Sequence, residues 1–93
     1  MMTDKLEAIT KSLNTLIQQS GERLGYLHDR WQDEKEYEDF AEYVNVMKSI
    51  TPSPFTFVKA TRKPFGFVLK HPDATVSFQI FANSRSCSWK AFR

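Results

Sequence analysis

The chain has 93 residues, of which 41% are hydrophobic and 26% are charged, and its formal net charge is +2. This length fits one domain over residues 1–93, and the composition is that of a globular rather than a disordered protein. The single cysteine, Cys87, excludes an intrachain disulfide, and neither a membrane-spanning apolar run nor the apolar segment of a signal peptide is found, so we expect a cytoplasmic protein without a membrane role.

The charges divide the chain into two parts of opposite sign. Residues 1–50 carry ten acidic and six basic side chains, a net charge of −4. Residues 51–93 carry seven basic side chains and one acid, Asp73, a net charge of +6. Such asymmetry favours an anionic partner for the basic part.

Residues 4–31 predict an amphipathic helix. Asp4 and Glu7 form a capping pattern, and the residues that follow place one apolar stripe along the helix: Leu6, Ile9, Leu13, Leu16, Ile17, Leu24, Leu27 and Trp31. Gly21 and Gly25 each cost about 1 kcal/mol in a helix interior, so the continuation through residues 20–31 stays open. The stripe either packs on a sheet or pairs with a second copy, which would give a homodimer through helix 4–31.

Residues 34–48 predict a second helix, which ends before Pro52 and Pro54. Its expected apolar face consists of Tyr37, Phe40, Ala41, Val44 and Met47. The opposite side is acidic, with Glu34, Glu36, Glu38, Asp39 and Glu42. An acidic helix of this kind suits a basic protein partner.

From residue 55 the hydrophobic period changes to two, which predicts strands at 55–61, 66–70, 75–82 and 86–92. The connections are too short for parallel crossovers, so we expect an antiparallel meander. The predicted fold is therefore α+β in the order α-α-β-β-β-β. Two N-terminal helices, forming an acidic part over residues 1–50, pack on a basic four-stranded antiparallel sheet over residues 55–93.

Few residues suit catalysis. His28, His71 and Cys87 are too few for a zinc site built from Cys and His, and the His28-Asp29 pair lacks the further ligands that metal chemistry needs. The three glycines do not form a phosphate-binding loop. We therefore expect a non-enzymatic protein with no metal and no cofactor.

The most specific local pattern is Lys63-Pro64-Phe65-Gly66-Phe67-Val68. It resembles the first ribonucleoprotein motif of RNA-recognition and cold-shock domains, in which two aromatic rings on one sheet face stack on bases. The resemblance implies stacking by Phe65 and Phe67 and a phosphate contact by Lys63. It covers six residues, Pro64 replaces a glycine of the motif, and the order of elements differs from an RNA-recognition domain, so no family is assigned. The alternative is that both rings point inward onto the helices.

Cations interleaved with aromatic rings predict a sheet that binds DNA or RNA. The candidate binding residues are Lys59, Arg62, Lys63, Phe65, Phe67, Lys70, Arg85, Trp89 and Lys90. The cations alternatively protect the sheet edges from pairing with other chains. The alternative function is that of a protein-interaction module or small inhibitor, acting through the acidic helix and the apolar stripe.

Overall fold

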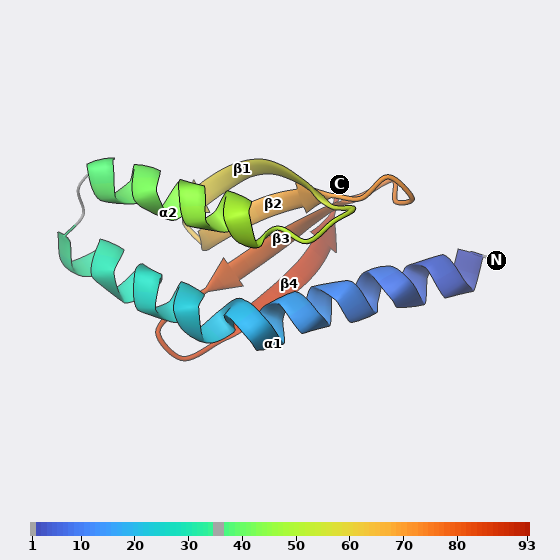
Figure 1. Ribbon diagram of the computed structural model, residues 1–93, viewed down its shortest axis with the longest axis horizontal. Helices are drawn as coiled ribbons and strands as arrows, with labels where there is room; N and C mark the ends of the chain where they lie inside the picture. Colours follow the sequence, from blue (N-terminus) through green and yellow to red (C-terminus); the bar gives the residue numbers. More distant parts are fainter. Residues whose placement is uncertain (1, 35–36) are drawn as a thin grey trace.

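The computed structural model describes residues 2–34 and 37–93, with side chains described for residues 5–32 and 40–93. Two helices are followed by four strands, as Figure 1 shows: α1 (Met2–Glu34), α2 (Tyr37–Ile50), β1 (Thr56–Arg62), β2 (Phe65–Lys70), β3 (Ser77–Ala82) and β4 (Cys87–Phe92). This order confirms the predicted α+β fold.

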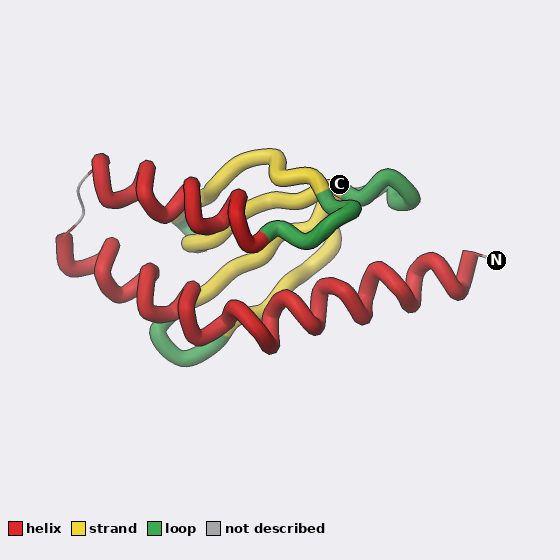
Figure 2. Tube along the Cα trace, viewed as in Figure 1, coloured by secondary structure: helices red, strands yellow, loops and turns green. Residues whose placement is uncertain are grey.

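The strands form one sheet in the order β1-β2-β3-β4, and every neighbouring pair is antiparallel, which confirms the meander. Both helices lie on the same side of this sheet (Figure 2). α1 packs against β3 and β4, and α2 packs against β1. Within the part of the chain that the structure describes, no helix therefore covers the other side of the sheet.

The core lies between the helices and the sheet. The large side chains that are fully buried come from both helices and from the sheet: Leu13 and Leu24 from α1, Tyr43 and Met47 from α2, and Phe67, Leu69 and Ile80 from the sheet. Complete burial of such a side chain stabilises a fold by about 1.5–3 kcal/mol. The helices are therefore part of the same folding unit as the sheet.

α1 is one continuous helix through the two glycines, which answers the question left open for residues 20–31. A Cβ on Gly25 would lie 2.9 Å from the carbonyl oxygen of Asn83, and one on Gly21 would lie 3.2 Å from Cβ of Cys87. The absence of side chains at these positions lets α1 approach the β3–β4 connection. The glycines thus cost helix propensity but allow close packing.

The apolar stripe of α1 packs on the chain's own sheet. Ile9, Leu13, Leu16, Leu24 and Leu27 are all buried in the core. Leu6 is the exception, with 63% of its surface exposed, where the N-terminal end of α1 projects past the sheet (Figure 1). The surface on which the homodimer prediction depended is therefore mostly covered within one copy, and the homodimer stays a prediction.

The buried face of α2 differs from the expected one. Phe40, Tyr43 and Met47 are buried, whereas Ala41 is exposed. Residues 35–36 lie outside the described residues, as do the side chains of Glu34, Glu36, Glu38 and Asp39, so the predicted acidic surface is described only at Glu42. The Glu42 carboxylate is exposed and lies 4.0 Å from the Arg30 guanidinium.

Candidate nucleic-acid interface

The side of the sheet away from the helices, called the open face below, follows from strand alternation and pairing. Phe78, Ile80 and Trp89 pack toward the core, so their neighbours in β3 and β4 point to the other side. The pairing of β3 with β2, and of β2 with β1, extends this assignment to the other strands. The open face consists of Thr56, Lys59, Thr61, Gly66, Val68, Lys70, Ser77, Gln79, Phe81, Ser88, Lys90 and Phe92.

Three lysines stand on the open face, and none of its residues is acidic. The central row across the strands reads Lys59, Val68, Gln79, Lys90, so one lysine lies on each edge strand. Lys70 lies on β2, between β1 and β3. All three lysines are exposed. Edge protection accounts for Lys59 and Lys90, but Lys70 is on an inner strand that has no free edge.

A hydrogen-bonded network ties three strands together at the centre of the open face. Nε2 of the buried Gln79 donates to Oγ1 of Thr61 at 3.1 Å, to the carbonyl oxygen of Phe67 at 3.3 Å and to that of Ile80 at 2.8 Å. The Thr61 hydroxyl in turn donates to the Pro64 carbonyl at 2.7 Å. The two N–H groups of Nε2 face three acceptors, which fixes the orientation of the amide.

Phe65 and Phe67 do not lie on the open face. Their exposed fractions are 2% and 0%, and both rings point toward the helices. The Phe65 ring is surrounded by rings from α1 and α2, namely His28, Trp31, Phe40 and Tyr43. The prediction that these two phenylalanines stack on bases is therefore wrong for the folded protein. Aromatic partners on the helices hold Phe65 in the core, and the Phe67 ring stacks on the Phe57 ring of β1.

Two further candidate residues are also directed to the helix side. Trp89 packs against the core, and its indole Nε1 donates a 2.8 Å hydrogen bond to Oδ1 of Asn14 on α1. The Arg62 guanidinium lies 4.5 Å from the centre of the Phe40 ring, which is a cation–π contact. Neither side chain belongs to the open face, which corrects the stacking role predicted for Trp89.

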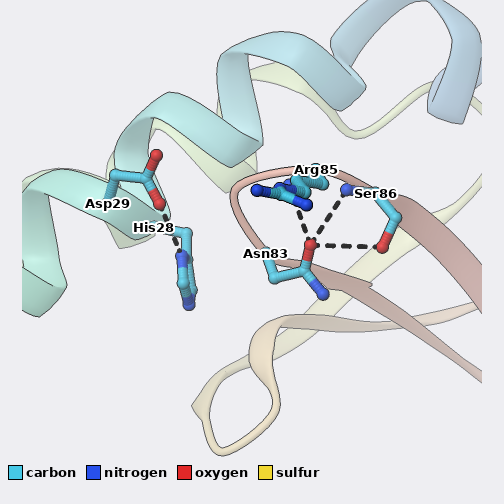
Figure 3. Close-up of polar contacts among 5 residues, drawn as sticks. All are labelled: His28, Asp29, Asn83, Arg85 and Ser86. Carbon is cyan, nitrogen blue, oxygen red and sulfur yellow. Dashed lines mark hydrogen bonds and ion pairs between the residues drawn. The ribbon is translucent and has the colours of Figure 1, made fainter.

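Lys63 and Arg85 lie in the two turns at one end of the sheet, and both are exposed. Here α1 passes beside the β3–β4 turn (Figure 3), whose shape is set by Asn83: its Oδ1 accepts from the backbone amides of Arg85 and Ser86, each at 2.9 Å. A pocket of about 310 Å³ at this end is lined in part by His28, Lys63, Phe81 and Asn83. Lys63 and Arg85 can therefore extend the lysine surface beyond this end of the sheet.

Sequence reasoning missed the two aromatic residues that the open face does carry, Phe81 and Phe92. Phe81 of β3 lies opposite Gly66 of β2, and Phe92 of β4 lies opposite Ser77 of β3. Phe92 is 38% exposed and Phe81 is half-buried. The phase of the alternation could have found Phe81, because it falls on the same side of β3 as Ser77 and Gln79.

Three features of the described side chains bear on catalysis. Among residues 5–32 and 40–93, no group of three His, Cys, Asp or Glu side chains is placed to hold a metal ion. His28 Nδ1 and Asp29 Oδ1 are neighbours on α1 at 3.1 Å (Figure 3). Burial raises the pKa of the Cys87 thiol, which disfavours the nucleophilic thiolate.

Within the described part of the chain, neither helix combines the length and the apolar character that crossing a membrane requires. Comparisons with protein-family models, with curated proteins and with solved structures found no match for this chain.

Proposed function

We propose that this protein is a non-enzymatic binder of nucleic acid and that the open face of its sheet is the binding surface. One observation carries the proposal: three exposed lysines, Lys59, Lys70 and Lys90, stand on the helix-free side of the sheet with no acidic residue among them. The phosphate backbone of a nucleic acid is a polyanion, and such a surface attracts it.

The position of the lysines suits an extended polyanion. Strands lie about 4.8 Å apart, so Lys59 on β1 and Lys90 on β4 are separated by about 14 Å across the sheet, and Lys70 lies between these two strands. Lys63 and Arg85 continue the positive surface at one end. The single acid of the basic part, Asp73, is 3.9 Å from the Lys5 ammonium of α1 and so is partly neutralised.

The test is fluorescence anisotropy of labelled oligonucleotides, titrated at several salt concentrations. Three lysine–phosphate contacts predict a slope of about −2 for log K against log salt with a single strand. The double variant Lys59→Glu/Lys90→Glu should lose most of the affinity. The matched control is Lys11→Glu/Arg23→Glu, which changes the net charge equally at two exposed positions of α1.

Equal losses in the two double variants would mean that net charge, not the open face, governs binding. No binding of any oligonucleotide at low salt would remove the proposal.

A cytoplasmic location, where nucleic acid is accessible to such a protein, stays part of the proposal and rests on the single thiol of Cys87.

A specific feature also supports a second candidate, a protein-interaction module. An apolar groove of about 590 Å³ runs between the start of α1 and the ends of β3 and β4, and the exposed Leu6 stands at its rim beside Ile9, Val76 and Trp89. Leu6→Asp should abolish such an interaction without changing oligonucleotide affinity. The homodimer is one form of this interaction, and sedimentation of wild type and Leu6→Asp tests it.

A further inference from the structure

The phenylalanines of this protein fall into two groups. Phe40, Phe55, Phe57, Phe65, Phe67 and Phe78 each contact another ring. Phe81 and Phe92 contact no other aromatic ring among the described residues, and both lie on the open face. Phe81 and Phe92 therefore lie on the same face of the sheet as the three lysines.

We infer that the open face takes unpaired, single-stranded nucleic acid, with bases stacked on Phe81 and Phe92 and phosphates held by the lysines. This inference rests on the proposed function and names its substrate class. Every base has an apolar face that can stack on a ring, so two rings within a lysine frame recognise a strand without requiring one sequence.

The shape of the face disfavours a duplex. The four strands span about 14 Å between the outer two, whereas the major groove of B-DNA is about 12 Å wide and the minor groove about 6 Å. A sheet presented by its face is too broad to enter either groove. A duplex would thus offer this surface only phosphates on its outside, and its paired bases could not reach Phe81 or Phe92.

The positions of rings and cations also suit a single strand. Phe81 and Phe92 are in different rows, the first opposite Gly66 and the second opposite Ser77, and the row of Lys59 and Lys90 lies between them. A strand that crosses the sheet therefore meets a ring, a row with a lysine on either edge, and a second ring. Bases and phosphates each find a suitable contact along this path.

Gln79, in the row between the two rings, supplies a fixed acceptor. Only 7% of the Gln79 surface is exposed, and its Nε2 lies within hydrogen-bond distance of three acceptors. Its Oε1 accepts no hydrogen bond from the described residues. This oxygen can accept from a base N–H, which becomes accessible in an unpaired strand.

The experiment compares four labelled probes of equal length: single-stranded DNA, single-stranded RNA, the DNA duplex, and an abasic strand that has the phosphates without the bases. We expect both single strands to bind at least about ten-fold more tightly than the duplex and the abasic strand. The DNA and RNA arms distinguish the two sources of a single strand.

The variants Phe81→Leu and Phe92→Leu keep an apolar side chain while removing the ring. Each should weaken single-strand binding by about ten-fold and leave abasic binding unchanged. The matched control is Tyr26→Leu, which removes a 62% exposed ring from α1. Circular dichroism of each variant checks that the fold is intact.

The outcomes separate the inference from the proposed function. Equal affinity for all four probes, with lysine variants still weakened and phenylalanine variants unchanged, would overturn the single-strand inference and leave nucleic-acid binding in place. Binding of none of the probes would overturn both. Equal weakening by Tyr26→Leu and Phe92→Leu would also overturn the stacking roles.

Discussion

The indole Nε1 of Trp89 on β4 donates a 2.8 Å hydrogen bond to Oδ1 of Asn14 on α1, 75 residues earlier in the chain. This bond fixes the side of β4 that α1 covers. Because neighbouring side chains in a strand point to opposite sides, it also fixes the direction of Lys90, which must lie on the open face. Position 89 therefore serves folding, and position 90 is available for binding.

The first prediction concerns this bond. Trp89→Phe and Asn14→Ala should each lower the free energy of unfolding by about 1 kcal/mol, and the double variant should lose less than the sum, because both changes remove the same hydrogen bond. Urea unfolding of the four proteins gives the coupling. Oligonucleotide affinity should stay unchanged. A several-fold loss of affinity in Trp89→Phe, at wild-type stability, would return Trp89 to the binding surface.

The second prediction separates core phenylalanines from surface ones. Phe67→Leu should cost about 0.5–3 kcal/mol of stability, because it leaves a space among fully buried side chains. Its effect on binding should disappear when affinity is corrected for the folded fraction. If Phe67→Leu instead weakened binding without destabilising the fold, the ring would have to be accessible to the ligand, contrary to its burial.

The third prediction ranks the glycines. Gly66 has φ of +157°, and a Cβ there would lie 1.9 Å from the carbonyl oxygen of Ile80, so Gly66→Ala must displace a strand and should cost at least about 3 kcal/mol. Gly25→Ala, with its contact to the Asn83 carbonyl at 2.9 Å, should cost less, and Gly21→Ala should be closest to neutral. Thermal unfolding measures the order. Stabilisation by Gly25→Ala of about 1 kcal/mol, the gain expected from helix propensity alone, would contradict the close approach.

The fourth prediction concerns Cys87. Because burial raises the pKa of its thiol above the ordinary 9.0, the unfolded chain ionises first as pH rises. The stability that this thiol contributes is complete below pH 9 and is lost as pH rises through its folded pKa. Wild type should thus lose more stability above pH 9 than Cys87→Ser, as measured by urea unfolding at each pH. Identical pH dependence of the two proteins would show that the thiol is not shielded.

The same shielding predicts slow chemical modification. At neutral pH the thiol of the folded protein should react with a disulfide reagent more slowly than that of the urea-unfolded chain, since the thiolate is the reacting form. Equal rates would agree with an exposed thiol instead.

The order of elements was predictable because its signals are local. Proline residues end α2, and the change of hydrophobic period from about 3.6 to two residues marks the start of the sheet. The continuity of α1 was not predictable, since the cost of Gly21 and Gly25 is local whereas their benefit, close contact with Cys87 and Asn83, depends on the β3–β4 connection. The three lysines of the open face were among the predicted binding residues.

The three predicted aromatic residues, Phe65, Phe67 and Trp89, lie on the helix side, because alternation gives two faces without saying which one the helices cover. Phe65 and Phe67 share one side of β2, as the motif requires, but Trp31, Phe40 and Tyr43 form an aromatic pocket on that same side. Only the packing of α1 and α2 decides this. The face that remains open then carries Phe81 and Phe92, which the motif does not include.

The most direct measurement of the central claim is lysine protection in the wild-type protein. Exposed amines are acetylated with and without a bound single-stranded oligonucleotide, and mass spectrometry gives the change at each lysine. We predict protection of Lys59, Lys70 and Lys90, with Lys63 partly protected and Lys11 and Lys48 on the helices unchanged. Protection of Lys11 and Lys48 with none on the open face, or no protection at saturating oligonucleotide, would contradict the account.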